Sequence, residues 1–271
     1  MTASPLSVGT DYETLANRFR PLFRKIAAGT LEREQARELP HEPIRWLKQA
    51  GFGAVRVPVE YGGSGASIGQ LFQLLIELAE ADSNIPQALR GHFAFVEDRL
   101  NASPSPERGA WFARFVAGEL VGNGWTEVGA VKLGEILTRI TPHGDKYLLN
   151  GAKYYSTGSL FADWIDVYAQ RSDNGADVIA LVHAHHPGVT QSDDWDGFGQ
   201  RTTGSGTSVY VDVPLSAEHV IPFETRFKYQ TAFYQLVLLA VLAGIGRAVE
   251  RDIAQEVRER KRVFSHGNAE T

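Results

Sequence analysis

The 271-residue sequence contains no cysteine. This absence excludes disulfides, iron–sulfur clusters, thiolate zinc sites and thiol catalysis. It is also typical of proteins from a reducing compartment, so we expect a cytoplasmic location. The N-terminal stretch MTASPLSVGTDYETL lacks the basic-then-apolar pattern of a secretory signal.

Positive charge and long apolar runs are scarce as well. The net charge is −5 and the isoelectric point is about 5.9. No stripe of Lys and Arg precedes the last predicted helix, so a nucleic-acid partner is not expected. The longest apolar stretch, residues 236–246, is too short to cross a bilayer, and no membrane partner is expected. Because this stretch is apolar on nearly every face, it must be buried by further helices or by another subunit.

Two further kinds of site lack their usual sequence pattern. The glycine-rich residues 51–65 lack the trailing Lys-Ser/Thr of a P-loop, which favours a conformationally demanding connection over phosphate binding. The histidines His183, His185 and His186 lie near one predicted strand end without a paired carboxylate. No metal site is therefore predicted.

The pattern of apolar residues changes twice along the chain. Apolar residues recur at helical spacing over residues 11–120, and Pro106 is placed to open a helix. Short candidate strands follow without helices between them, which favours an antiparallel arrangement. They cover residues 135–141, 147–149, 164–170, 178–182 and 208–213.

Residues 226–262 then show the pattern of one long helix. The resulting prediction is an α+β protein in three parts. These are a helical N-terminal domain (1–121), a small antiparallel β-sandwich or barrel as the middle domain (122–224), and the first helix of a C-terminal helical bundle (225–271).

Two short segments carry the residues that suit a flat ligand. The NGAK segment, NGAKYYSTGS at 150–159, combines a predicted Asn-Gly hairpin turn with aromatic and hydroxyl side chains. The GNGW segment, GNGWTE at 122–127, has the same mixture. An aromatic side chain can cover a ring face while hydroxyls and backbone amides bond its edge, so we predict that both segments build one cofactor pocket.

Five sequence motifs, in this order, resemble the acyl-CoA dehydrogenase superfamily. They are PVEYGGSGAS (58–67), GNGWTE (122–127), LNGAKYYSTGSLFADW (149–164), GFGQRTTGSGT (197–207) and RERKRVF (258–264). The resemblance implies a flavin, FMN or FAD, held between the β domain and a four-helix bundle. It also implies three more bundle helices beyond the end of this sequence, together with a homo-oligomer, a dimer or a tetramer.

Matched to the family motifs, five residues are expected at the flavin. Trp125 and Thr126 would meet the pyrimidine side of the ring through backbone and hydroxyl, and Tyr155 would lie beside the ring. Thr157 would bond near N5, and Asn123 looks like a ring contact of the monooxygenase branch. Core packing is the alternative for Trp125 and Tyr155.

Near the end of the chain, Arg260 and Arg262 flank the position where the family binds cofactor phosphates across subunits, and Arg262 is taken as the cofactor-binding candidate. Both arginines also suit the C-terminal end of a helix dipole.

The segment after the TE pair distinguishes two branches of the superfamily. Dehydrogenases continue TE as PGAGSD along the acyl-CoA, whereas this chain has TEVGAVKLG at 126–134. Three segments resemble the dibenzothiophene-monooxygenase and sulfone-monooxygenase-like branch, namely RGHF (90–93), WDGFGQR (195–201) and RVFSHG (262–267). That branch takes reduced FMN from a separate reductase and uses oxygen on a small-molecule substrate.

Two residues are candidates for catalysis. Thr157 would supply a hydroxyl near the reacting flavin atoms, and its alternative is a threonine that caps its own turn. His92 would supply an acid–base group, and its alternative is a core histidine on an apolar helix.

Three functions stay open at this point. The first is a flavin-dependent monooxygenase, and the second is an FAD-dependent acyl-CoA dehydrogenase. The third is a non-catalytic, truncated paralogue that acts as a binding or assembly partner.

Overall fold

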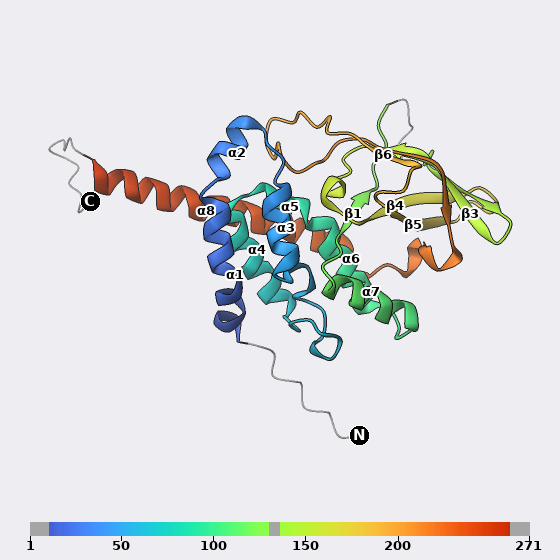
Figure 1. Cartoon of the computed structure of the whole chain (residues 1–271), viewed down its shortest axis with the longest axis horizontal. Coiled ribbons are helices and arrows are strands. Elements are labelled where there is room, and N and C mark those ends of the chain that lie inside the picture. The colour runs from blue at the N-terminus through green and yellow to red at the C-terminus, as the bar shows by residue number, and fades with distance from the viewer. Residues whose placement is uncertain (1–10, 130–135, 261–271) are drawn as a thin grey trace, which may run out of the picture.

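The structure is a computed structural model that describes residues 11–129 and 136–260. Helices lie on one side of the molecule, a β-sheet lies on the other, and a long last helix runs along the helical side (Figure 1). This arrangement confirms the predicted α+β fold class. The predicted division into domains stays a prediction.

The helical part is built from amphipathic helices with clear start signals. Ser67 and Gln70 form a capping box at the start of α4, and Pro106 occupies the first turn of α7 as predicted. The core contains Phe52, which packs edge-to-face on Phe19 and Phe93 at centroid distances of 5.1 and 5.7 Å. The helices are α1 (Tyr12–Ala27), α2 (Thr30–Ala36), α3 (His41–Gln49), α4 (Ile68–Ala81), α5 (Asn84–Ala88), α6 (Arg90–Asn101) and α7 (Pro106–Val116).

The eight strands form one mixed sheet in the order β6-β7-β3-β2-β4-β5-β8, with β1 paired to β4. One face of this sheet packs on α6 and α7 through Phe95, Trp111 and Trp164. The opposite face has its own core around Ile165 and Tyr210. The strands are β1 (Val121–Gly124), β2 (Arg139–His143), β3 (Lys146–Lys153), β4 (Trp164–Arg171), β5 (Asp177–His183), β6 (Val189–Gln191), β7 (Ser208–Leu215) and β8 (Val220–Pro222).

Two strand pairings are parallel, which the spacing of the strands did not predict. β1 pairs with the first half of β4, with Val121 opposite Trp164, and β2 pairs with its end, with Arg139 opposite Gln170. Both strands therefore run along the same edge of β4 in the same direction. The segment between them turns away to pair with β3, where Thr126 bridges Tyr154.

The predicted hairpin turn at Asn150-Gly151 is wrong. Both residues lie inside β3, and the hairpin turns instead at Gly144, in the PHGD stretch at 142–145. Gly151 has φ +149° at a register shift in the β3–β7 pairing, and a Cβ atom there would meet Thr138 Oγ1 at 2.5 Å. The Asn-Gly pair thus forms a bulge rather than a turn.

Helix α8 (Gln230–Glu259) packs on α4 along one face only. At Gly244 the two helices come so close that a Cβ atom would meet Ala79 Cβ at 2.4 Å. The other face leaves large side chains exposed, including Leu239, Leu242 and Ile253 at 59, 64 and 59 %. Within the described residues, the predicted burial of this helix is therefore seen on the face toward α4 and not on the opposite face.

Of the described helices, α8 alone is long and apolar enough to cross a membrane by length and composition. The core helices of globular proteins share this property, and α8 lies in the helical layer.

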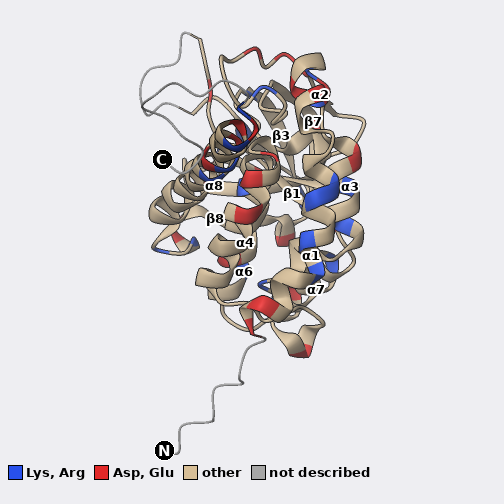
Figure 2. Ribbon diagram, turned by 90° about the vertical axis from the view of Figure 1, so that its left-hand side faces the viewer, with Lys and Arg blue, Asp and Glu red and all other residues tan. Residues whose placement is uncertain are grey.

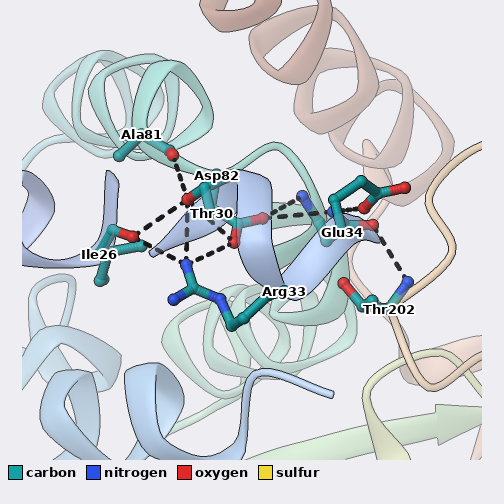
Figure 3. Close-up of polar contacts among 8 residues, drawn as sticks. Ile26, Thr30, Arg33, Glu34, Ala81, Asp82 and Thr202 are labelled. Carbon is teal, nitrogen blue, oxygen red and sulfur yellow. Dashed lines mark hydrogen bonds and ion pairs between the residues drawn. The ribbon is translucent and has the colours of Figure 1, made fainter. Parts of the chain in front are cut away.

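A buried polar cluster ties α2 to α4 (Figure 3). Arg33 donates to Asp82 Oδ2 at 3.0 Å and to the carbonyl of Ile26 at 2.8 Å, while Thr30 donates to the carbonyl of Ala81 at 2.8 Å. Nearby, Asn84 donates to Glu34 Oε2 at 3.2 Å. The arginine charge is thus neutralised inside the protein, and α2 is held against the end of α4.

Charged residues are mixed over the helical face shown in Figure 2, where blue and red positions lie on neighbouring helices. Basic residues do not merge into one continuous stripe on the described part of this face.

Candidate cofactor site

The GNGW and NGAK segments meet, as the sequence predicts. The backbone N–H of Tyr154 donates to the carbonyl of Thr126 at 2.8 Å. Beside this bond, Lys153 Nζ lies 2.7 Å from Glu127 Oε1, and both side chains are buried. Glu127 also accepts from the backbone N–H of Leu137 at 2.7 Å. Lys153, together with the backbone N–H groups, lowers the pKa of Glu127 to about 2, so the pair is ionised.

The junction opens into a pocket of about 280 Å³. The GNGW segment provides one wall, Tyr155 of the NGAK segment provides a second, and the start of α8 closes the third. This volume lies near the small end of ligand pockets, which begin at roughly 300 Å³, so it suits a ring system rather than a whole dinucleotide. The lining residues are Arg90, Asn123, Trp125, Thr126, Tyr155, Gln230, Thr231, Tyr234 and Gln235.

Trp125 is held in a fixed orientation. Its indole Nε1 donates to Asp166 Oδ1 at 2.8 Å, and its ring packs against Tyr234 at a centroid distance of 6.0 Å. Behind the ring, Arg226 is buried and lies 3.1 Å from Asp166 Oδ2. Arg226 neutralises the buried charge of Asp166 and holds this carboxylate in place. Asp166 in turn fixes the indole of Trp125.

Tyr155 stands at the exposed rim of the pocket. It adopts φ +58° and is 43 % exposed, and its ring contacts Trp195 at a centroid distance of 5.7 Å. Trp195 lies on the loop between β6 and β7, which Arg37 of the helical part holds through two bonds of 2.9 Å to Asp193. A left-handed backbone at a tyrosine costs energy, so the surrounding contacts must impose this position.

Thr157 lies behind Tyr155 and is buried. Its hydroxyl shares a 2.8 Å hydrogen bond with Ser205 Oγ and lies 3.3 Å from the carbonyl of Tyr155. Ser205 continues to Thr203 Oγ1 at 2.7 Å. Thr157 therefore belongs to a hydroxyl chain next to the pocket and is absent from the pocket lining. Its predicted role at the flavin stays a prediction.

His92 does not reach the pocket. It is 1 % exposed, its Nε2 lies 2.9 Å from the carbonyl of Gly53, and its Nδ1 accepts from the backbone N–H of Val121 at 3.3 Å. Burial lowers its pKa to about 4, so the ring is neutral. This geometry is that of the core histidine that was the alternative, and the predicted acid–base role of His92 stays a prediction.

Two buried polar atoms of the pocket lining have no hydrogen-bond partner. They are Arg90 Nε and Asn123 Oδ1. A larger cavity of about 640 Å³ lies beside β5 near Arg171 and Phe223, but no such atom belongs to its lining among the described residues. Buried polar groups normally have partners, so this donor and this acceptor distinguish the smaller pocket from the larger one as a candidate ligand site.

The remaining candidate, Arg262, lies outside the described residues. Arg260 ends α8, and about 40 Å of helix separates it from the pocket at the opposite end. Within one chain Arg260 therefore cannot reach this pocket.

The remaining lining residues were not predicted. Arg90 stands in the RGHF motif, which indicated only a branch of the superfamily. Gln230, Thr231, Tyr234 and Gln235 carry no local signal, because their place beside Trp125 depends on how α8 packs.

Comparison with known proteins shows which families and structures this chain resembles. The family model of the acyl-CoA dehydrogenase N-terminal domain matches residues 11–119. The resemblance predicted from the five motifs is confirmed, and the order of helices, mixed sheet and last helix is that of the acyl-CoA dehydrogenase-like fold.

Individual relatives of this chain include monooxygenases, nitrososynthases and a putative acyl-CoA dehydrogenase of Bacillus subtilis. A dibenzothiophene monooxygenase from Rhodococcus erythropolis is 28% identical over 217 residues, which cover 77% of this chain and 51% of the relative. An L-evernosamine nitrososynthase from a Micromonospora species is 28% identical over 257 residues, covering 89% and 60%. The chain spans about half the length of the dibenzothiophene monooxygenase.

Among solved structures, the FMN-bound TdsC of Paenibacillus sp. A11-2 superimposes with a TM-score of 0.86 at 25% identity. The match covers 93% of this chain and 67% of TdsC. Another structure of TdsC contains FMN and indole.

Proposed function

We propose that this chain forms the flavin-binding part of a flavin-dependent monooxygenase. The observation that carries the proposal is the pocket in which Trp125 and Tyr155 meet beside the unpaired atoms of Arg90 and Asn123. The monooxygenase relatives and the FMN-bound TdsC structure support it.

The lining residues fit an isoalloxazine ring. Trp125 and Tyr155 offer aromatic surface for its faces, and Arg90 Nε and Asn123 Oδ1 offer a donor and an acceptor for its polar edge. The hydroxyls of Thr126 and Thr231 line the same pocket. The volume leaves no room for an adenine, so the pocket accepts the ring of FMN and of FAD alike.

When bound, reduced flavin would supply the electrons with which one atom of O₂ is transferred to a substrate. The chain's own residues orient the ring and keep water away. Trp125 is locked by Asp166, Tyr155 is supported by Trp195, and Tyr234 closes the pocket from α8. A dry and rigid surrounding strengthens each polar contact with the ligand.

The substrate we propose is a small organic molecule with a sulfur or nitrogen atom as the oxygen acceptor. One relative is named for dibenzothiophene and another for an amino sugar. The departure of TEVGAVKLG from the dehydrogenase sequence supports the same choice over an acyl-CoA thioester. We also propose a separate reductase as the source of reduced flavin and a cytoplasmic location.

We further propose a homo-oligomer, because the exposed apolar face of α8 would be covered in one.

The experiment combines flavin binding with oxygen reactivity. The full chain is titrated with FMN and with FAD, reduced anaerobically, and mixed with ¹⁸O₂ and indole or dibenzothiophene. We expect flavin binding and one ¹⁸O atom in the product. Tyr155→Ala should weaken flavin binding, while Tyr61→Ala, an exposed aromatic distant from the pocket lining, should leave it unchanged.

Two results would overturn this proposal. A chain that binds neither flavin would favour the non-catalytic paralogue. Anaerobic bleaching of bound FAD by an acyl-CoA would instead favour a dehydrogenase.

A further inference from the structure

Arg90 is a partly buried cation with no acidic partner among the described residues. It is the first residue of α6, its Nε is buried without a hydrogen bond, and its guanidinium lies 5.1 Å from the ring centroid of Tyr234. Among the described residues, no carboxylate forms an ion pair with it. Desolvation lowers its pKa from the usual arginine value without making it neutral at physiological pH.

Two other inward-facing arginines of this chain are neutralised by carboxylates. Arg33 pairs with Asp82 at 3.0 Å (Figure 3), and Arg226 pairs with Asp166 at 3.1 Å. A buried charge without a counter-charge is costly, so a protein keeps one where a ligand provides the missing charge. Among the described arginines with a buried, unpaired nitrogen, Arg90 is the one that lines this pocket.

The rest of the pocket lining reinforces the positive field. None of the nine lining residues is Asp or Glu. Thr231 lies in the first turn of α8, where the partial positive charge of a 30-residue helix faces the pocket. The aromatic side chains of Trp125, Tyr155 and Tyr234 require a flat occupant rather than a compact ion.

We propose that Arg90 makes this pocket selective for a planar ring that carries negative charge on the edge facing α6. Two ligands share this chemistry. One is the reduced isoalloxazine, whose negative charge lies on the pyrimidine part of the ring, and the other is an aromatic substrate with an acidic group. The first of these rests on the proposed function, whereas the second does not need a flavin.

The test uses Arg90→Gln, which removes the charge, and Arg90→Lys, which keeps it. Arg45→Gln is the matched control, because Arg45 is exposed on α3 and pairs with Glu42. Circular dichroism and thermal melting first establish that each variant is folded. Dissociation constants are then measured for oxidised FMN, reduced FMN, benzoate and its neutral isostere benzamide. Trp125 lines the pocket, so tryptophan fluorescence reports benzoate and benzamide without any flavin.

Loss of a charged hydrogen bond should weaken anion binding by about tenfold or more. If the ring anion is the ligand, Arg90→Gln weakens binding of reduced FMN while oxidised FMN changes less than threefold, and the flavin reduction potential falls. If an acidic substrate is the ligand, benzoate binding weakens while benzamide binding does not.

In both arms, Arg90→Lys should retain part of the affinity and Arg45→Gln all of it. Equal affinities of wild type and Arg90→Gln for reduced FMN and for benzoate would overturn the proposal. A wild-type chain that binds benzoate through Arg90 but no flavin would overturn the monooxygenase proposal alone.

Discussion

Lys153 and Glu127 form a buried ion pair, with Nζ and Oε1 2.7 Å apart, at the point where the two pocket-forming segments join. Burial lowers the pKa of Lys153, and the hydrogen bond from Lys153 lowers the pKa of Glu127. We regard both groups as charged, because Glu127 also accepts backbone hydrogen bonds from Leu137 and Thr138. The pair therefore holds the pocket wall in place.

Replacing Lys153 by Met should destabilise the protein by about 3 kcal/mol, because Glu127 is left buried without its counter-charge. Urea unfolding followed by circular dichroism measures the change. Lys146→Met is the matched control, since Lys146 is an exposed lysine of the same strand, and it should change stability by less than about 0.5 kcal/mol. Equal effects of the two changes would show that the ion pair does not matter.

Acid should weaken the fold through Glu127. Its pKa is about 2 in the folded protein against 4.5 ordinarily, so its stabilising contribution is complete above pH 4.5 and is lost as the pH falls toward 2. The loss is up to about 3 kcal/mol. Unfolding measured from pH 7 to pH 2 should show a steeper decline for the wild type than for Glu127→Gln. Parallel curves for the two proteins would contradict the depressed pKa.

His92 should produce a separate acid-dependent loss at higher pH. Its folded pKa of about 4 lies below the ordinary 6.5, so the unfolded chain binds the extra proton first. Stability should fall by about 3 kcal/mol between pH 6.5 and pH 4. His92→Gln can still bond Gly53 and Val121, and it should lack this part of the pH dependence. A variant with the same slope as the wild type would assign the loss to other groups.

Thr157→Val should lower oxygen transfer while FMN affinity stays within a few-fold, because the hydroxyl would act on the reacting atoms rather than hold the ring. The measurement is product formation under single turnover, with the FMN dissociation constant determined separately. Thr157→Ser keeps the hydroxyl and should retain activity. Ser205→Ala removes the neighbour of that hydroxyl and tests the chain between them. Unchanged turnover in Thr157→Val would leave only the turn-capping role.

Much of the fold can be predicted from local sequence. The spacing of Leu15, Phe19 and Ile26 predicts the face that α1 buries, and Pro106 marks the start of α7. Strands β4, β5 and β7 lie where the short apolar runs predict them, to within two residues at each end. These features depend on neighbours along the chain, so the sequence displays them directly.

The meeting of the GNGW and NGAK segments was also predicted, through a family resemblance rather than through spacing. His92 shows the opposite case. The sequence left two interpretations open for it, and its contacts with Gly53 and Val121, which lie far away along the chain, could not be predicted from its neighbours.

The amino-acid sequence alone specified the helical N-terminal part, strands β4, β5 and β7, the long last helix, and the two segments that bear the aromatic and hydroxyl groups. Tertiary packing decided that β1 and β2 run parallel to β4, that His92 lies in the core, and that Arg90 and Tyr234 complete the pocket. The physical reason is distance along the chain. Periodicity and turn chemistry act over a few residues, whereas strand partners, burial and unpaired charges depend on segments that meet only when the chain has folded.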